Sequence, residues 1–406
     1  MHILLIHQAF AAIDEPGGTR HHEIARHLAA RGHQVTIIAS PVSYLTGKAR
    51  SQRIPWVERQ DGGAGVTILR AYTYPALHKS FVHRVVSFLS FMIASFQIGL
   101  NVREVDLIWG TSPPIFQGMT AWSLARLKRV PFLFEVRDLW PAFAIAVGVL
   151  RQPLLIHLSE WLERFLYQHA DRVIVNSPGF IDHVRESGAR KIELVPNGAE
   201  VAMFDPTATG EPFREKLGLQ AKYIALYAGA HGLSNDLGTL LEAASRLRQL
   251  PDLAIVLLGD GKEKTTLLAQ AAQLGLSNVY FVPPVPKNEM PGILAGANAC
   301  IAILKPVSMY ATVYPNKVFD YMAAGRPIVL AIEGVIRKVV EEAQAGIFVV
   351  PGDAQALADA IQYLAEHPQE GVEMGLRGRR QVEHNFNRPV LADQMAGIME
   401  RMVNKV

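Results

Sequence analysis

The chain has 406 residues, of which half are apolar and 19% are charged, and its formal net charge is +3. This length exceeds what one hydrophobic core usually supports, so two domains of about 200 residues each are expected. The composition excludes a disordered chain, and the positive charge is too small to indicate a nucleic-acid-binding protein. The single cysteine, Cys300, excludes a disulfide framework within the chain.

The first half of the chain alternates short β-branched runs with helical patterns, which predicts a parallel sheet with helices on both faces. The expected strands are Ile3–His7, Gln34–Ala39, Val105–Trp109, Phe132–Val136, Arg172–Asn176 and Lys191–Pro196, with a small side strand at Gly62–Ala71. The expected helices are Arg20–Arg31, Phe81–Asn101, Ile115–Leu127, Pro153–His169 and Pro178–Ser187.

The second half repeats this design and predicts a second parallel sheet. The expected strands are Tyr223–Tyr227, Ala254–Leu258, Val279–Val282, Ala299–Leu304, Pro327–Ala331 and Gly346–Val349. The expected helices are Leu237–Leu250, Glu263–Leu274, Lys287–Leu294, Lys317–Ala323, Gly334–Ala343, Ala354–Glu366 and Pro389–Val403.

The segment between the two halves, from Pro196 to Pro212, is rich in proline, glycine and threonine, which is typical of a hinge between domains. We expect Rossmann-like domains at residues 1–200 and 201–388, with a final helix at 389–406 that packs back on the N-terminal domain. Ligands bind at the carboxyl ends of the strands in such sheets, so two domains facing each other would form a ligand-binding cleft.

One strongly apolar segment, Phe81–Leu100, has about the length of a membrane span. Its internal His83 and Arg84, together with several serines, favour a partly exposed crossover helix over a span. The apolar arc of this helix is wide. Two interpretations have equal weight: a fully packed crossover helix, or peripheral attachment to a membrane through side chains that include Phe88 and Phe91.

The loop before the first helix carries Gly17 and Gly18. Paired glycines let a backbone approach an anionic ligand at a helix N-terminus, although a plain tight turn explains the pair equally well. The G-x-G-x-x-G pattern is absent, and the second strand ends without the acidic residue that holds an NAD ribose. These absences argue against an NAD-dependent dehydrogenase.

The second domain opens in a similar way, with Gly229, His231 and Gly232 between a strand and a helix. These residues predict a diphosphate site in which His231 adds a hydrogen-bond donor, and a plain surface histidine in a turn is a nearly equal alternative. A third glycine loop contributes Lys262 as a candidate cation. This loop lacks the P-loop pattern, so ATPase chemistry is not supported.

The most specific segment runs from Tyr314 to Val329 and reads YPNKVFDYMAAGRPIV. It resembles the P-S-K-x-F-E-Y-M-A-x-G-x-P-I segment of family 4 glycosyltransferases, especially bacterial enzymes of O-antigen, capsule and colanic acid assembly. The resemblance spans the whole chain and includes Glu135–Pro141; the chain looks most similar to the N-acetyl-L-fucosamine transferase subgroup. It implies an α/β architecture of the retaining GT-B type, with two Rossmann-like domains facing each other across a cleft.

The resemblance places Asn316, Lys317 and Asp320 in the site for the nucleotide sugar. In the family, a glutamate at the position of Asp320 holds the ribose hydroxyls, and a second glutamate eight residues earlier contacts the donor sugar. Thr312 occupies that second position, so the family's E-x7-E motif is not intact. Lys317 lies one helical turn before Asp320, where it could neutralise a leaving diphosphate.

Arg137 and Asp138 directly follow the expected strand Phe132–Val136. The family commonly carries a His-Asp pair in this loop, near the reacting sugar, and Arg137 replaces the histidine. Both residues are catalytic candidates, with Asp138 orienting a sugar hydroxyl. A structural role, such as capping the next helix, is an equal alternative.

These features predict a retaining transferase that moves an N-acetylated hexosamine or deoxyhexosamine from a UDP-sugar to a lipid-linked or glycan acceptor in bacterial surface polysaccharide assembly. The chain has no D-x-D, H-E-x-x-H or paired C-x-x-C motif, so no metal or other cofactor is expected, and cationic side chains would take its place. The expected location is cytoplasmic, peripheral on an anionic membrane surface, with no nucleic-acid partner.

Two other functions are compatible with the same fold. A sugar-nucleotide 2-epimerase would use the same donor, but the sequence shows no acid and base carboxylates for that reaction. A non-catalytic subunit of glycan assembly is the other alternative, motivated by Thr312 and Arg137 at positions where the family has catalytic residues.

Overall fold

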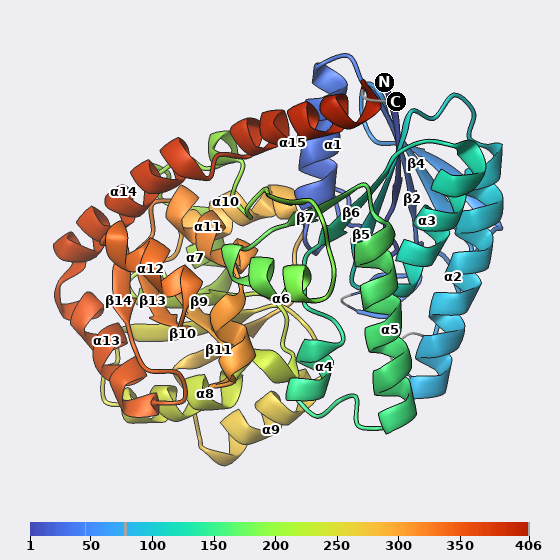
Figure 1. The fold of residues 1–406 in the computed structure, drawn as a ribbon. Helices are drawn as coiled ribbons and strands as arrows, with labels where there is room; N and C mark the ends of the chain where they lie inside the picture. Colours follow the sequence, from blue (N-terminus) through green and yellow to red (C-terminus); the bar gives the residue numbers. More distant parts are fainter. Residues whose placement is uncertain (45, 77–78, 405–406) are drawn as a thin grey trace. The chain divides into compact units, whose positions relative to one another are not determined.

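The computed structural model describes residues 1–44, 46–76 and 79–404. The chain divides into two compact units (Figure 1). Unit 1 comprises Met1–Ile13, Gly17–Pro196 and Pro389–Val406, and unit 2 comprises Asp14–Pro16 and Asn197–Arg388. The main chain therefore leaves unit 1 after Pro196 and returns to it at Pro389.

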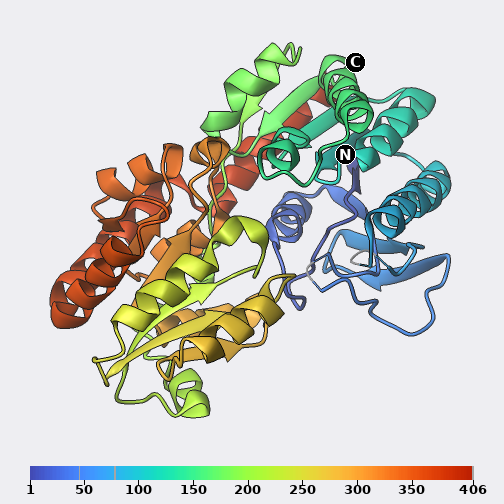
Figure 2. The same cartoon turned by 90° about the horizontal axis from the view of Figure 1, so that it is seen from below.

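Unit 1 is built on an eight-stranded sheet with the order β3-β4-β2-β1-β5-β6-β7-β8. Its strands are β1 (His2–Ile6), β2 (Gln34–Ala39), β3 (Val57–Asp61), β4 (Val66–Ala71), β5 (Leu107–Ser112), β6 (Phe132–Val136), β7 (Arg172–Val175) and β8 (Ile192–Leu194). Only β3 runs antiparallel to its neighbour, and it forms a hairpin with β4 at one edge of the sheet (Figure 2). Central strands such as β5 and β6 are buried along their whole length because helices cover both faces.

The helices of unit 1 form a layer on each face of this sheet. They are α1 (Arg20–Ala30), α2 (Phe81–Asn101), α3 (Phe116–Lys128), α4 (Ala142–Ala146), α5 (Pro153–His169), α6 (Ile181–Glu186) and α15 (Arg388–Val403). Helix α3 packs between α2 and α5 on one face. On the other face, Leu391, Met395 and Met399 of α15 share an apolar cluster with Ile24 and Leu28 of α1, and the two helices lie side by side in Figure 1.

Unit 2 has a fully parallel six-stranded sheet with the order β11-β10-β9-β12-β13-β14. Its strands are β9 (Tyr223–Ala228), β10 (Leu253–Leu258), β11 (Val279–Val282), β12 (Ala299–Ile303), β13 (Ile328–Ala331) and β14 (Gly346–Phe348). Its helices are α7 (Glu211–Leu217), α8 (Leu237–Arg246), α9 (Lys264–Gln273), α10 (Met290–Ala295), α11 (Asn316–Ala323), α12 (Val335–Glu342), α13 (Ala354–Glu366) and α14 (Pro368–Asn385). The predicted fold class, two Rossmann-like domains with parallel sheets, is confirmed.

The side strand expected at Gly62–Ala71 is half of a hairpin. Residues 62–65 form the turn, because Gly63 and Gly65 adopt φ values of +103° and +78° that other residues rarely adopt. The partner strand β3 lies before this turn and was not expected. Its alternation of exposed and half-buried residues identifies it as an edge strand.

Helix α14 was also not expected, since Gly371, Gly375 and Gly378 interrupt its pattern. The structure places these glycines on one helical face, where they let α14 approach α11 and the chain that follows it. A Cβ atom at Gly375 would lie 2.0 Å from the carbonyl oxygen of Gly325, and one at Gly378 would lie 3.0 Å from the Cβ of Ala345. The glycines are therefore required by packing rather than by a turn.

The wide apolar arc of α2 is divided between two environments. Phe88 packs against Phe116 with ring centroids 5.6 Å apart, and Phe91 is fully buried. The expectation that Phe88 and Phe91 face lipid is therefore wrong. The exposed apolar side chains are Val82, Val86, Leu89, Ile93 and Leu100, which form a stripe along the opposite side of the helix.

The glycine face of α14 yields a prediction on stability. Gly375→Ala should lower the free energy of unfolding of unit 2 by about 1–3 kcal/mol, because the added methyl group meets a backbone carbonyl that cannot move aside. Calorimetric unfolding measures the change. Gly397→Ala on α15 is the control, since its methyl group would meet only the flexible end of Arg401 at 3.4 Å; equal destabilisation by both variants would contradict the prediction.

Candidate functional sites in the two units

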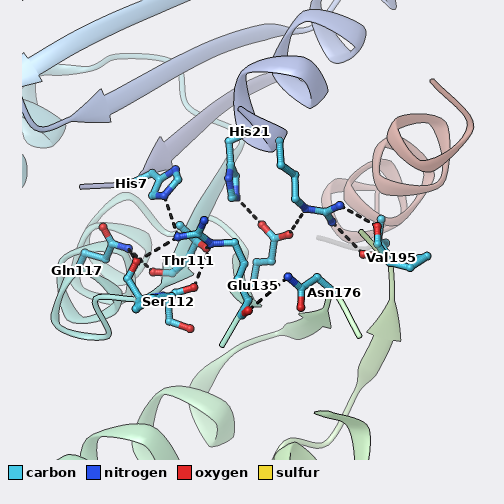
Figure 3. A network of polar contacts seen from close by, with 12 residues as sticks. His7, His21, Thr111, Ser112, Gln117, Glu135, Asn176 and Val195 are labelled. Atoms are coloured by element: carbon cyan, nitrogen blue, oxygen red, sulfur yellow. Dashed lines mark hydrogen bonds and ion pairs between the residues drawn. The ribbon is translucent and has the colours of Figure 1, made fainter. Parts of the chain in front are cut away.

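A buried ion pair organises the carboxyl end of the unit 1 sheet (Figure 3). Glu135 lies in β6 with no exposed surface, and its carboxylate accepts Nε–H of Arg20 at 3.0 Å and Nε2–H of His21 at 2.6 Å. Arg20 also donates to the carbonyl oxygens of Val195 and Pro196, at 2.9 and 2.8 Å. The first turn of α1, strand β6 and the chain after β8 are thereby held together.

The charge states in this network follow from burial. Burial alone would raise the pKa of Glu135, but His21 and Arg20 outweigh it and hold that pKa well below its ordinary value. Burial lowers the pKa of His21 to about 4, against the opposing effect of Glu135. At neutral pH the pair is therefore an ionised Glu135 with a charged Arg20, beside a neutral His21 that donates from Nε2.

The guanidinium of Arg137 is held by groups of unit 1, among them Thr111 and Ser112, which Figure 3 labels. Its Nε donates to Thr111 Oγ1 at 2.9 Å and to the carbonyl oxygen of Ser112 at 3.1 Å. Its Nη2 donates to the carbonyl oxygen of Pro113 at 3.1 Å and lies 2.9 Å from Nε2 of His7. Because an arginine can only donate, His7 accepts at Nε2, and burial with the nearby Arg137 keeps the pKa of His7 well below its ordinary value.

Asp138 follows Arg137 and has an unsatisfied oxygen. Its Oδ1 is buried and has no hydrogen-bond partner among the described residues. Burial raises the pKa of Asp138 to about 7, although the adjacent Arg137 opposes this shift. The charge of Asp138 also acts on Tyr44, which identifies that phenol as a neighbour. Asp138 is therefore a half-buried carboxyl group with capacity to accept a hydrogen bond from a ligand.

Gly17 and Gly18 lie in the exposed turn that leads to α1. Gly17 has φ +145°, and a Cβ atom there would lie 3.0 Å from the Cβ of Ala11, whereas a Cβ at Gly18 would meet no atom. Thr19 follows them and donates to Glu23 at 2.6 Å. The turn thus uses the freedom of glycine at position 17.

In unit 2, two glycine loops at the carboxyl ends of β9 and β10 fit closely against each other. Gly229 and Gly259 have φ values of +152° and +147°, and a Cβ atom at Gly259 would lie 1.8 Å from the carbonyl oxygen of Gly229. His231 is fully buried between these loops, and its backbone N–H donates to Asp260 at 2.8 Å. Neither ring nitrogen of His231 has a hydrogen-bond partner among the described residues, and burial lowers the pKa of His231 to about 4.

Lys317 extends from α11 to the first of these loops. Its Nζ is buried without a hydrogen-bond partner among the described residues and lies 3.9 Å from the centre of the Tyr227 ring. A Cβ atom at Gly229 would lie 2.6 Å from this nitrogen, so only glycine leaves room for it. Burial lowers the pKa of Lys317 to about 7. The sequence-predicted Gly229, His231 and Lys317 therefore lie together.

Asp320 lies one turn further along α11 and forms an ion pair that was not expected. Lys287, in the short 3-10 helix Lys287–Glu289, places its Nζ 2.6 Å from Oδ2 of Asp320, with both side chains largely buried. Nothing in the sequence pattern connects these two residues, which are 33 positions apart. Asp320 therefore has a fixed cation beside it before any ligand is bound.

The remaining candidates lie around this cluster. Asn316 is the first residue of α11, and its Oδ1 is buried without a partner among the described residues. Thr312 ends a 3-10 turn and donates to the carbonyl oxygen of Met309 at 2.6 Å. Gly232 directly precedes the 3-10 turn Leu233–Asn235. Lys262 is exposed, and the nearby Lys264 donates to the carbonyl oxygen of Gly259 at 2.9 Å.

Two family models match the chain. One, described as a glycosyl transferase 4-like domain, matches residues 17–198, and the other, described as glycosyl transferases group 1, matches residues 222–367. WcaI of Escherichia coli K12, named for colanic acid biosynthesis as a glycosyl transferase, is 27% identical over 321 residues, which are 77% of this chain and 78% of WcaI.

Solved structures with the same fold were also found. Sucrose-phosphate synthase from Thermosynechococcus elongatus has a TM-score of 0.80 at 22% identity and covers 100% of both chains. Anabaena Alr3699/HepE, solved in complex with UDP-glucose, has a TM-score of 0.72 at 18% identity over 99% of this chain and 100% of that one. The fold and the matched models define a glycosyltransferase of the GT-B type. The chain belongs to glycosyltransferase family 4.

The buried histidines of unit 1 yield a prediction on pH dependence. His7 and His21 stay neutral in the folded chain, whereas an unfolded histidine takes up a proton below about pH 6.5. The unfolded state then binds more protons at these two histidines, so their contribution to the free energy of unfolding should fall as pH decreases from 6.5 toward 4, by about 1.4 kcal/mol per pH unit for each histidine. Asp138, whose pKa burial raises to about 7, opposes this trend in the same range. Urea unfolding at several pH values measures this slope.

His7→Gln should reduce the slope of the free energy of unfolding against pH by the contribution of one histidine. Glutamine keeps an acceptor for Arg137 and does not titrate. His157→Gln, on the exposed side of α5, is the matched control for removing a histidine side chain from unit 1. An unchanged slope in His7→Gln would show that His7 is protonated in the folded state.

Proposed function

We propose that the protein is a retaining glycosyltransferase that uses a UDP-sugar donor and a lipid-linked or glycan acceptor in bacterial surface polysaccharide assembly. The name of WcaI and the UDP-glucose complex of HepE support this assignment. The observation that carries it is the cluster of Gly229, His231 and Lys317, in which both ring nitrogens of His231 and Nζ of Lys317 are buried without a partner in the described protein.

In the proposed reaction, the acceptor hydroxyl oxygen forms a bond to the anomeric carbon while the bond from that carbon to the diphosphate oxygen breaks. The electron pair of the broken bond leaves with UDP. Attack from the face on which UDP departs retains the anomeric configuration, and the proton of the hydroxyl passes to a diphosphate oxygen. Such a path depends on positioning and on cations near the leaving group more than on a protein base.

Lys317 is suited to the leaving group because its ammonium is buried and unpaired. A diphosphate beside Nζ would raise the pKa of Lys317 from its lowered value, so binding takes up a proton and creates an ion pair. This pair strengthens as negative charge accumulates on the departing phosphate. A neutral His231 adds one ring N–H donor, and no metal ion is required in this scheme.

Asp320 is proposed to accept the ribose hydroxyls, with Lys287 holding its carboxylate in place. Asp138 is proposed to accept a hydrogen bond from an acceptor hydroxyl at its unpartnered Oδ1. Arg137 acts as a positioning residue for the loop at Ser112, because its guanidinium donates to the carbonyl oxygens of both Ser112 and Pro113. A 2-epimerase would instead convert the donor without any acceptor, which an assay of donor alone distinguishes.

Asp320→Ala should raise the dissociation constant of UDP by about tenfold to a hundredfold, because a charge-assisted hydrogen bond contributes about 1.5–3 kcal/mol. Titration calorimetry with UDP measures this. The wild-type protein should also bind 2′-deoxy-UDP more weakly than UDP, and the variant should not distinguish the two nucleotides.

Asp359→Ala, on the exposed side of α13, is the matched control for removing a carboxylate from unit 2 and should keep wild-type affinity. If Asp320→Ala still prefers UDP to the deoxy analogue by the wild-type factor, another residue holds the ribose and the assignment is wrong.

We further propose peripheral attachment of unit 1 to the inner face of the cytoplasmic membrane. Helix α2 is the one helix in the described chain that is long and apolar enough to cross a membrane, with a mean hydropathy of 1.3. It packs against α3, and its exposed apolar stripe of Val82, Val86, Leu89, Ile93 and Leu100 is available to contact lipid. Exposed basic residues, Lys79 and Arg103, lie beside its two ends.

Helix α5 adds a second exposed apolar stripe on the same face of the sheet. It consists of Leu154, Leu158 and Trp161, which recur at helical spacings of four and three. Both stripes begin at the N-terminal ends of crossover helices, and therefore near the carboxyl edge of the sheet that carries Asp138. A lipid-linked acceptor held at that surface would present its sugar to this edge.

Replacing Val86, Leu89 and Ile93 together by serine should reduce partition to anionic phosphatidylglycerol vesicles at low salt by more than about tenfold, since each buried aliphatic side chain contributes about 1.5–3 kcal/mol. Co-sedimentation measures binding, and UDP affinity should stay unchanged. Val372→Ser with Leu376→Ser, exposed on α14, is the control. If the wild-type protein does not co-sediment with these vesicles, membrane attachment through α2 is wrong, and α2 is a crossover helix without a role in lipid binding.

The sugar specificity stays a prediction. An N-acetylated hexosamine or deoxyhexosamine and the N-acetyl-L-fucosamine subgroup rest on the sequence resemblance alone. A thermal-shift screen of UDP-sugars tests them, because a ligand at 100 times its dissociation constant stabilises the folded protein by about 2.7 kcal/mol.

A further inference from the structure

Two aromatic side chains form a stacked pair at the β3–β4 edge of unit 1. Trp56 directly precedes β3 and Tyr72 directly follows β4, and the backbone N–H of Tyr72 donates to the carbonyl oxygen of Trp56 at 2.9 Å. Their ring centroids are 5.8 Å apart with an angle of 13° between the planes. Trp56 is nevertheless 47% exposed, so the face of its indole that does not contact Tyr72 is open to a ligand.

A fixed carboxylate lies beside this pair on the same face of β3. Side chains two positions apart on a strand point the same way, so Trp56, Glu58 and Gln60 share a face. Buried Arg70 donates to Gln60 Oε1 at 2.9 Å, and Gln60 Nε2 donates to Glu58 Oε1 at 2.8 Å. Oε2 of Glu58 has no hydrogen bond among the described residues, and the network holds it in position as an acceptor.

This combination of groups has the chemistry of a carbohydrate site. One face of a pyranose ring presents C–H groups of slightly positive charge, which match the negative face of an aromatic ring. The hydroxyl groups project from the edge of the sugar, where a carboxylate accepts their protons. Because the indole is already held against Tyr72, little side-chain freedom is lost when a sugar stacks on it.

The position of the pair relates it to the acceptor. Tyr72 follows β4, which is parallel to β2 and β1, so it lies at the same edge of the sheet as His7 and Asp138. Four strand spacings separate β4 from β6, a distance of about 19 Å. A sugar on Trp56 would therefore be several residues away from a hydroxyl held at Asp138.

We propose that Trp56, Tyr72 and Glu58 form a subsite that binds a sugar residue of the acceptor remote from the residue being glycosylated. That the bound sugar belongs to an acceptor rests on the proposed transferase function. The binding of a neutral sugar to these residues does not depend on it. The subsite selects acceptors that already carry an oligosaccharide.

Saturation-transfer NMR with four neutral probes tests the subsite: the methyl glycosides of glucose, mannose, rhamnose and N-acetylglucosamine. The wild-type protein should saturate the C–H protons on one ring face of at least one probe. Trp56→Ala should weaken that binding about tenfold, and Glu58→Gln should weaken it less, since stacking is kept. UDP affinity, measured on the same samples, should be unchanged in both variants.

Trp161→Ala is the matched control. Trp161 is 55% exposed and also stacks on another aromatic ring, Phe165, but it belongs to the apolar stripe of α5. The proposal is overturned if the wild-type protein saturates none of the probes, or if Trp161→Ala weakens binding as much as Trp56→Ala does. A loss of vesicle binding in Trp56→Ala with unchanged sugar binding would likewise overturn it, and would assign Trp56 to the lipid surface.

UDP binding separates this proposal from the proposed function. If the wild-type protein binds a probe through Trp56 but does not bind UDP, the carbohydrate subsite stands and the donor assignment fails. If it binds UDP and Trp56→Ala leaves probe binding intact, the donor assignment stands and the subsite is wrong.

Discussion

The carboxylate of Glu135 is the constraint on which the working edge of unit 1 depends. It has no contact with water, so its charge must be balanced by Arg20 and by the N–H of His21. Arg20 in turn fixes Val195 and Pro196, after which the main chain leaves unit 1. Loss of one partner from such a buried pair typically costs about 3–5 kcal/mol, because the other charge is left uncompensated. The loop that carries Arg137 and Asp138 is thus attached to a strand that is already held on both sides.

At the carboxyl ends of the strands of unit 2, several buried polar side chains lack a partner, in contrast to the paired Glu135 of unit 1. Lys317, His231 and Asn316 each have a buried polar atom without a partner in the described chain. Buried polar groups are rarely left unsatisfied in folded proteins, because each one costs free energy. A ligand that supplies both negative charge and hydrogen-bond acceptors would satisfy the first two at once. Asp138 Oδ1 is a comparable unsatisfied group in unit 1, but in unit 2 the unsatisfied nitrogens of Lys317 and His231 lie together, where one nucleotide could reach both.

Much of the fold could be predicted because buried parallel strands have an unambiguous pattern: the bounds of β2 and β6 follow from their apolar runs alone. The order of apolar and polar residues did not predict the structure where the packing of side chains of particular size determines it. No element was expected at α14, and its glycines have a structural reason only once the carbonyl of Gly325 is known to lie against Gly375. Likewise, the apolar arc of α2 could not show that Phe91 faces inward and Ile93 outward. Site residues that lie within a recognisable sequence motif could be predicted. Lys287 and His7 could not be predicted, because only the tertiary fold brings them to Asp320 and Arg137.

The return of the chain to unit 1 has a consequence for the order of biosynthesis. The apolar cluster around β1 and α1 includes Leu391, Met395 and Met399, which follow the whole of Asn197–Arg388 of unit 2 in the chain. Domains generally fold as units in the order of their synthesis, with the N-terminal one first. Here the unit whose translation begins first cannot complete its core until unit 2 has been synthesised. The part of the nascent N-terminal unit that α15 covers in the folded protein therefore stays uncovered while unit 2 is being made.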